Sequence, residues 1–238
     1  INAHLTKEYI FIQHRGSSLI SQFSRDGSFI RNVGSIGRGP QEYLLARHFS
    51  INEKDRKIYI HTNWSRKILV YSFDGDYLKK IEFAGLDNGI YTWYKDNLFV
   101  GFSEPYIGNE VSVFTVVNDV GDTIQTIPNY NLWSKKYQTR GITSFIGRNV
   151  FYWFQNSLHM KGWYNDTVYC LTDNLHVKPK YYINLDSYQI PAQKNLRDPS
   201  QKYYWIGVNE SASYIFINYG TFSLKSKEKG IMYYNKSS

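Results

Sequence analysis

The sequence predicts an all-β protein, a β-propeller built from four-stranded antiparallel blades. Three observations predict it: a repeat of about 48 residues, Asp-Gly turns between β-rich runs, and a high content of aromatic residues. Aromatics make up 18% of the 238 residues, and such residues favour the pleated, half-buried surfaces of sheets. Repeating units of about 40–50 residues that hold four strands each are typical of propellers.

The repeat is clearest between residues 8–33 and residues 56–81. Phe23–Gly27 aligns with Tyr71–Gly75 at an offset of 48 residues. An Asp-Gly pair between two β-rich runs predicts a hairpin, because the turns that join such strands need positive φ angles. A β-sandwich is the competing all-β fold, but it does not require a repeat of this length.

The unit returns in weaker form along the rest of the chain. Turn aspartates fall at Asp26, Asp74, Asp119 and Asp173, with spacings of 48, 45 and 54 residues. The second unit is expected to hold the strands Arg47–Ile51, Lys57–His61, Lys67–Phe73 and Tyr77–Phe83. The other expected strands include Ile1–Leu5, Leu98–Val100, Val111–Val117, Thr123–Ile127, Val150–Phe154, Thr167–Leu171, Leu175–Leu185, Tyr203–Val208, Tyr214–Asn218 and Ile231–Tyr234.

The chain thus carries about five units, which fit either a five-bladed ring or part of a six-bladed one. We expect a single propeller domain over residues 1–238 that is incomplete at both ends. No apolar run approaches the roughly 18 residues of a membrane span. Ile1 opens near a strand-like segment, so no signal peptide is expected there.

The charge of the chain is basic, with a formal net charge of +8 and an isoelectric point of about 9.3. A basic protein can bind nucleic acid or other polyanions. The basic residues are scattered, however, and the tightest cluster (Lys225, Lys227 and Lys229) alternates with Ser and Glu. We therefore expect a solvated surface at this cluster, with an anion-binding patch as the alternative.

The segment Gly34–Tyr43 contains three glycines and a proline. A phosphate-binding loop would need a helix N-terminus directly after it, and a β-rich run follows instead. The sequence therefore predicts a structural crossing from an outer strand to the next inner strand. In this crossing Glu42 would accept hydrogen bonds from backbone N–H groups, and Tyr43 would wedge between blades. A ligand contact is the alternative role of the loop.

Two of these segments, Phe23–Gly27 and Gly37–Tyr43, together resemble the six-bladed β-propeller family. This family is related to the NHL-repeat proteins, and its members are mostly lipoproteins of Gram-negative gut anaerobes. Asn165–Tyr169 resembles a later element of the family, and the resemblance covers about residues 8–185. Gln41 departs from the family pattern, where glycine is usual. The resemblance implies a location in the cell envelope, periplasmic or anchored to the outer membrane.

One face of the propeller is expected to carry the binding surface. In propellers with this strand order, the crossings lie on the same face as the loops that join each second and third strand. We therefore place Gly34–Tyr43, His61–Arg66, Gly101–Glu110 and Asn156–Asn165 on that face. Exposed aromatics and Arg are what a sugar-binding or peptide-binding surface uses, and aromatic packing between blades is the alternative. The candidate ligand-binding residues are Arg38, Glu42, Trp64, Arg66, Tyr106, His159 and Trp163.

Motifs for catalysis or metal binding are absent from the sequence. His14 and His61 differ by one position in the repeat register, so their side chains are expected on opposite faces. There is no His-x-x-x-His or Cys-x-x-Cys pair and no Gly-x-Ser-x-Gly motif. Acidic pairs such as Asp119 and Asp122 lie in turns, where capping explains them. We expect no catalytic residue, no metal site and no cofactor.

The leading functional hypothesis is a cell-envelope binding or scaffold module for a glycan or a protein. The alternative is an NHL-like propeller enzyme, a lyase or lactonase that holds a divalent cation in its central channel. A third hypothesis, nucleic-acid binding through net charge, would show a steep salt dependence. No nucleic-acid partner is expected, and membrane contact is expected only through a lipid anchor outside this chain. The sequence leaves the ligand and the oligomeric state open.

Overall fold

A computed structural model gives the structure of residues 2–14, 19–62, 67–82, 89–103, 105, 109–130, 132, 150–162, 165–189, 202–222 and 228–237. In these residues the regular structure is almost entirely β-strand, with one short 3-10 helix, η3 (Asp186–Tyr188). None of the helical structure in these ranges has the length and hydrophobicity that a membrane-spanning helix needs.

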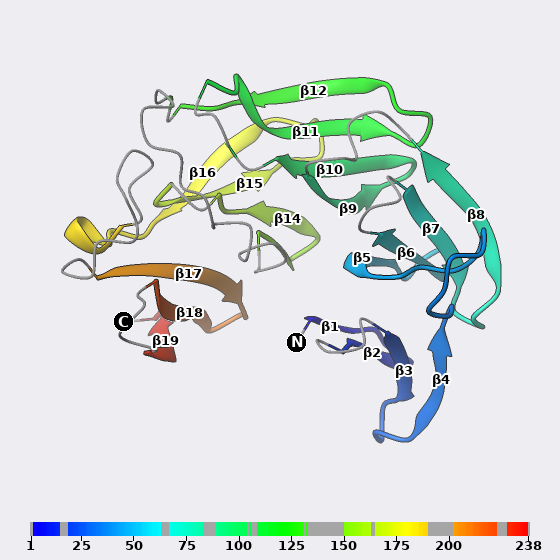
Figure 1. Cartoon of the computed structure of the whole chain (residues 1–238). Helices are drawn as coiled ribbons and strands as arrows, with labels where there is room; N and C mark the ends of the chain where they lie inside the picture. Colours follow the sequence, from blue (N-terminus) through cyan, green and yellow to red (C-terminus); the bar gives the residue numbers. More distant parts are fainter. Residues whose placement is uncertain are drawn as a thin grey trace. The chain divides into compact units, whose positions relative to one another are not determined.

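The strands form five antiparallel sheets in which each strand pairs with the next one along the chain (Figure 1). We call the sheets blades 1 to 5 in chain order. Four blades have four strands, and three strands are described for blade 5. Blade 1 contains β1 (Asn2–Leu5), β2 (Tyr9–Gln13), β3 (Ile20–Ser24) and β4 (Phe29–Val33). Blade 2 contains β5 (Ala46–Asn52), β6 (Lys57–Thr62), β7 (Lys67–Ser72) and β8 (Tyr77–Glu82).

The later blades follow the same order. Blade 3 contains β9 (Gly89–Lys95), β10 (Leu98–Ser103), β11 (Ser112–Asn118) and β12 (Thr123–Pro128). Blade 4 contains β13 (Phe151–Phe154), β14 (Ser157–Met160), β15 (Thr167–Leu171) and β16 (Val177–Tyr182). Blade 5 contains β17 (Tyr203–Glu210), β18 (Tyr214–Phe222) and β19 (Lys229–Asn235). The predicted fold class, an all-β propeller of four-stranded antiparallel blades, is confirmed. The described residues supply five of these sheets, so a sixth blade is not among them.

The chain divides into two compact units. Unit 1 comprises Ile1–Gly101 and Thr115–Ile124, and unit 2 comprises Phe102–Phe114 and Gln125–Ser238. Blades 1 and 2 lie in unit 1, blades 4 and 5 lie in unit 2, and the strands of blade 3 are shared between the two units.

The core of unit 1 consists of apolar side chains from neighbouring blades. Phe11, Phe49 and Ile60 are completely buried and belong to one cluster of blades 1 and 2. In a second cluster, the rings of Tyr59 and Trp93 stack with centroids 6.1 Å apart. Aromatic side chains of unit 1 therefore pack one blade against the next.

The turns between third and fourth strands have the predicted chemistry. Gly27 and Gly75 have φ angles of 92° and 87°, which glycine adopts without steric cost. The N–H groups of these glycines donate to the carbonyls of Ser24 and Ser72, at 3.0 and 3.1 Å. The Asp-Gly pairs thus close hairpins in blades 1 and 2, as the repeat predicted.

Two strands were not predicted from the sequence, β9 and β14. The sequence predicts no strand for residues 89–95, and it predicts a loop for residues 157–160. In the structure Gln155 and Asn156 have φ angles of 48° and 58°, which turns the chain so that β14 pairs with β13. A four-residue strand is too short for a period-2 pattern to stand out, so only the pairing reveals it.

Candidate functional site

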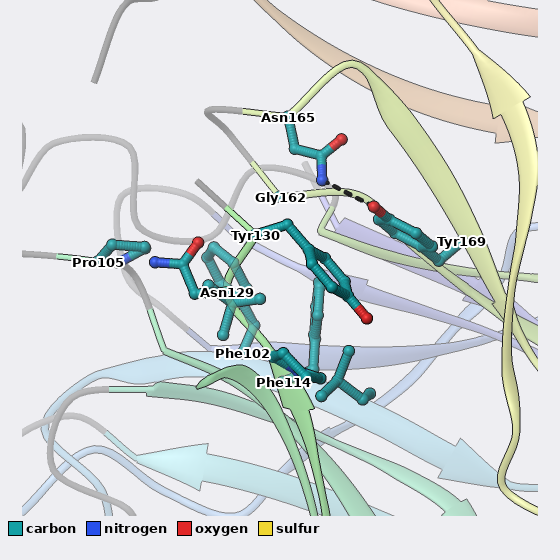
Figure 2. A pocket seen from close by; sticks show the side chains of 11 residues that line it. Phe102, Pro105, Phe114, Asn129, Tyr130, Gly162, Asn165 and Tyr169 are labelled. Atoms are coloured by element: carbon teal, nitrogen blue, oxygen red, sulfur yellow. Dashed lines mark hydrogen bonds between the residues drawn. The ribbon is translucent and has the colours of Figure 1, made fainter. Parts of the chain in front are cut away.

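The candidate site is a pocket in unit 2 that lies between strands β10–β12 and the β14–β15 region (Figure 2). The space between its atoms measures about 490 Å³, including the part that is open to solvent. Its lining residues are Phe102, Pro105, Val113, Phe114, Ile127, Pro128, Asn129, Tyr130, Gly162, Asn165 and Tyr169.

The floor of the pocket is apolar. Phe102 at the end of β10 and Phe114 in β11 are each 2% exposed, and their ring centroids lie 5.1 Å apart. Gly162 faces them, because a Cβ atom added to it would lie 3.6 Å from Cε2 of Phe102. The pocket therefore offers a preformed apolar surface, since these rings are fixed by packing inside the unit.

Uncharged polar groups stand opposite this floor (Figure 2). Asn165 Nδ2 donates to the Tyr169 hydroxyl at 3.1 Å, and Asn165 Oδ1 accepts from the backbone N–H of Thr167 at 2.6 Å. Both the nitrogen and the oxygen of the Asn165 amide are therefore hydrogen-bonded, which fixes the orientation of the side chain. Tyr130 is 74% exposed, so its ring is available to a ligand. None of the described lining residues is charged, and the pocket suits an uncharged, largely apolar group.

The pocket combines loops that the sequence placed on one face. Pro105 lies in the β10–β11 loop, Asn129 and Tyr130 follow β12, and Gly162 lies in the β14–β15 loop. The N–H of Asn129 donates to the carbonyl of Val111 at 2.9 Å, which fixes the chain as it leaves β12. Within unit 2, an outer-strand exit and two loops between second and third strands therefore meet at one place.

Four of the predicted ligand-binding residues lie outside the described residues: Trp64, Arg66, Tyr106 and Trp163. Two of them directly follow residues that line the pocket, Tyr106 after Pro105 and Trp163 after Gly162.

Glu42 has the structural role that the sequence predicted. Its Oε2 accepts a hydrogen bond from the N–H of Gly39 at 2.8 Å, and its Oε1 lies 3.4 Å from Ser35 Oγ. Tyr43, the next residue, is 1% exposed and donates its hydroxyl hydrogen to the Val33 carbonyl at 2.8 Å. Burial raises the pKa of Tyr43 to about 12. Arg38 is exposed in the same crossing, in unit 1.

His159 does not lie in an exposed loop, and that part of the prediction is wrong. It is in β14, is 1% exposed, and its ring stacks on Tyr152 with centroids 4.7 Å apart. Nδ1 lies 3.2 Å from the Ser157 carbonyl, and Nε2 has no hydrogen-bond partner in the described part of the chain. Burial lowers the pKa of His159, so the ring is held neutral. The physical reason is the β13–β14 hairpin, which turns this segment into the blade.

Sequence reasoning missed a buried polar cluster next to His159. The Glu210 side chain is 1% exposed, and it accepts hydrogen bonds from Tyr181 at 2.5 Å and from Tyr152 at 3.3 Å. Lys236 Nζ lies 2.6 Å from Glu210 Oε1 and 4.1 Å from the centre of the Phe154 ring. No motif marks these residues, because they come from three strands (β13, β16 and β17) and the turn after β19.

The charges of this cluster are balanced. Burial alone would raise the pKa of Glu210, but the Lys236 ammonium and the Tyr181 hydroxyl outweigh it and hold that pKa below its ordinary value. Burial also raises the pKa values of Tyr152 and Tyr181, so both remain hydroxyl donors. A carboxylate whose oxygens are already occupied in this way fastens blade 4 to blade 5 rather than binding a ligand.

A buried lysine lies beside the pocket residues Gly162 and Asn165. Lys161 is 3% exposed and donates to the Gly162 carbonyl at 3.0 Å, and burial lowers its pKa to about 8. Burial also raises the pKa of Asp166, whose Oδ1 is buried without a hydrogen-bond partner in the described residues. This pair does not line the pocket, so we assign it no ligand contact.

Within the described ranges, no group of three or more His, Cys, Asp or Glu side chains has the arrangement of a metal site. The structure thus brings together uncharged groups at the pocket and a neutralised ion pair at the blade 4–blade 5 contact.

Solved structures with the same fold include two from Bacteroides. A Bacteroides fragilis protein described as a "Putative exported protein" matches with a TM-score of 0.73 and 18% identity, over 99% of this chain and 68% of its own. A DUF4221 family member from Bacteroides vulgatus matches with a TM-score of 0.65 and 12% identity, over 99% and 77%. A streptogramin B lyase matches with a TM-score of 0.53 and 11% identity, over 99% and 68%.

At these identities the likeness shows the fold alone. A comparison with the curated proteins finds no match. A family model described as "Domain of unknown function (DUF4934)" matches residues 2–238, and the chain therefore belongs to the DUF4934 family.

Proposed function

We propose that this chain is a binding module of the cell envelope, and that the unit 2 pocket holds an uncharged, largely apolar group of its ligand. The observation that supports this proposal is the preformed pocket, with buried phenylalanines as its floor and amide and phenol groups opposite them. Ligand sites are typically concave and mostly apolar, with a few well-placed polar groups that fix orientation.

The sequence leaves two classes of ligand open, a protein and a glycan. The residues that line the pocket favour a protein. An apolar side chain of a protein would bury its surface against Phe102 and Phe114, as anchor residues do at protein interfaces. A glycan would place one apolar sugar face on Tyr130 and its hydroxyls near the Asn129 and Asn165 amides. The scarcity of polar groups among the described lining residues weighs against a polyhydroxyl ligand.

The envelope location rests on two similarities. The sequence resembles a family of lipoproteins, and a protein of the same fold is described as exported. In this proposal the membrane is reached only through a lipid anchor outside residues 1–238.

The test is a binding screen of residues 1–238 against envelope proteins and glycan arrays. Tyr130→Ala, Trp64→Ala and Trp163→Ala are compared with Tyr182→Ala, whose side chain is 69% exposed in the same unit as Tyr130 but does not line the pocket. We expect Tyr130→Ala to weaken binding about tenfold or more, as loss of an aromatic contact does at an interface. Equal binding by Tyr130→Ala and Tyr182→Ala would reject the pocket as the ligand site.

A lyase is the second candidate, and the similarity to streptogramin B lyase is the observation that favours it. An enzyme of this kind would need a channel cation, so metal analysis of the purified protein separates the two candidates. One equivalent of a divalent ion that survives dialysis would favour the enzyme over the binding module.

A further inference from the structure

Tyr169 brings a phenol hydroxyl to the unit 2 pocket (Figure 2). The residue belongs to β15 and is partly buried, and its oxygen lies next to the Asn165 amide. Within the described residues, this hydroxyl makes one hydrogen bond, in which Asn165 Nδ2 lies 3.1 Å from the phenol oxygen. The direction of that hydrogen bond decides what the hydroxyl can offer to a ligand.

A backbone group fixes the direction of the Asn165–Tyr169 hydrogen bond. The N–H of Thr167 can only donate, and it lies 2.6 Å from the other end of the Asn165 amide. That end must be the oxygen, so the amide NH2 group faces Tyr169 and the phenol oxygen is the acceptor. The hydroxyl hydrogen of Tyr169 therefore points away from Asn165, and no acceptor for it lies among the described residues.

Two buried tyrosines of unit 1 show which partner such a hydroxyl takes in this protein. Tyr43 donates to the carbonyl of Val33 at 2.8 Å, and Tyr71 donates to the carbonyl of Gln41. Neutral backbone carbonyls thus accept from phenols that are packed among apolar side chains. A carbonyl oxygen of a ligand would have the same role at Tyr169.

The apolar lining of the pocket makes this hydroxyl hydrogen important for specificity. Phe102 and Phe114 are each 2% exposed, and Ile127 is 5% exposed. A ligand group that fills this pocket excludes water from the Tyr169 hydroxyl, whereas Tyr130 is 74% exposed and can bond to water. A buried donor without an acceptor costs free energy, so the pocket should discriminate against groups that lack an acceptor.

We propose that Tyr169 donates its hydroxyl hydrogen to a neutral carbonyl oxygen of the ligand, and that the apolar group beside this carbonyl lies on Phe102 and Phe114. In a protein ligand, these are a backbone carbonyl and the apolar side chain next to it. A carboxylate is disfavoured as the acceptor, because none of the described lining residues carries a charge that would balance it. The inference rests on the proposed function, since it specifies the chemistry of the ligand group in the same pocket.

The experiment measures the affinity of residues 1–238 for three probes by NMR titration. Acetophenone has an apolar ring beside a carbonyl, and α-methylstyrene has the same shape with a CH2 group in place of the carbonyl oxygen. N-acetyl-phenylalanine N-methylamide presents the ring and the carbonyl as a peptide does. Each probe is titrated into the wild type, Tyr169→Phe and Tyr188→Phe. Tyr188 is the matched control, because it is 51% exposed in unit 2 and does not line the pocket.

We expect Tyr169→Phe to weaken the binding of acetophenone and of the amide probe about threefold to tenfold, which corresponds to the loss of one hydrogen bond. The affinity for α-methylstyrene should stay the same, which also shows that the variant keeps the pocket folded. Tyr188→Phe should change none of the three affinities. An acetophenone affinity that Tyr169→Phe leaves unchanged would overturn the proposal. Binding of acetophenone without binding of the amide probe would overturn the assignment to a peptide carbonyl.

Failure of this inference can be distinguished from failure of the proposed function. If Tyr130→Ala and Tyr182→Ala bind the three probes equally well, the pocket is not the ligand site and both proposals are wrong. The same holds if none of the three probes binds to the wild type. If Tyr130→Ala weakens binding and Tyr169→Phe does not, the pocket is the ligand site and only the role of the Tyr169 hydroxyl is wrong.

Discussion

The Nζ atom of Lys236 lies 2.6 Å from Oε1 of Glu210, and the Glu210 side chain is 1% exposed. Lys236 also donates to the Ser211 carbonyl at 2.5 Å. These contacts tie the turn after β19 to the β17–β18 hairpin and, through Tyr152 and Tyr181, to blade 4. The buried Glu210 carboxylate needs a cation beside it, because burying an unpaired charge lowers the stability of the folded state.

The first prediction concerns this ion pair. Lys236→Met should destabilise the protein by about 3 kcal/mol, because it leaves the Glu210 carboxylate buried without its cation. Urea unfolding followed by tryptophan fluorescence measures the change. Lys202→Met is the control, since the Lys202–Glu228 pair has a similar distance of 2.7 Å but is 39% and 51% exposed. That variant should change stability by about 1 kcal/mol or less. If both variants lost the same free energy of unfolding, burial would not be what makes the Lys236–Glu210 pair important.

The second prediction concerns acid stability and two histidines of unit 1. Burial lowers the pKa of His48 to about 3 and that of His4 to about 4. The unfolded chain binds protons near the ordinary value of 6.5, so it takes up more protons than the folded chain as the pH falls below that value. Stability should therefore be full above about pH 7 and fall toward pH 4, with a slope of at most about 1.4 kcal/mol per pH unit for each histidine.

Urea unfolding at a series of pH values tests this dependence on pH. His48→Gln should flatten the slope, because it removes one of the groups that titrate differently in the two states. An identical slope in the wild type and in His48→Gln would show that His48 does not carry the effect.

The third prediction concerns the crossing loop. A Cβ atom added at Gly37 would lie 1.9 Å from Glu42 Oε2, so Gly37→Ala must displace the carboxylate from the N–H of Gly39. Gly37→Ala and Glu42→Ala should each cost about 1 kcal/mol, because both lose the same hydrogen bond. The double variant should cost less than their sum by about 0.5 kcal/mol or more. Additive losses in the thermodynamic cycle would mean that the two residues act independently.

The fourth prediction concerns packing inside blade 3. A Cβ atom at Gly101 would lie 2.3 Å from the ring of Tyr91, which is itself 4% exposed and unable to move freely. Gly101→Ala should therefore destabilise the protein by about 1–3 kcal/mol through overpacking. Gly162→Ala is the matched control, since its nearest contact would be an ordinary 3.6 Å to Phe102. Thermal unfolding of both variants should show a lower Tm for Gly101→Ala alone.

Much of the fold could be predicted from the sequence because its signals are local. The Asp26-Gly27 and Asp74-Gly75 turns depend only on neighbouring residues, and they appear where the repeat places them. The strands of blade 2 likewise begin and end within one residue of their predicted bounds. The role of Glu42 as a backbone acceptor could also be predicted, because its partner Gly39 is three residues away.

The candidate site could be predicted only in outline. The sequence indicated which loops share a face, and two of the named loops, Gly101–Glu110 and Asn156–Asn165, contribute residues that line one pocket in unit 2. It could not identify Phe102, Phe114 or Tyr169 as lining residues, because a strand pattern does not distinguish a residue that faces a pocket from one that faces a filled core.

By itself, the sequence determined the repeating hairpins of this protein, through the repeat of about 48 residues and turns that require positive φ. Only the tertiary structure decided that His159 stacks on Tyr152 and that Lys236 reaches Glu210. The physical reason is that strand formation depends on neighbours within a few residues. Contacts between blades depend on which faces two sheets bury against each other, and no spacing along the chain encodes that choice.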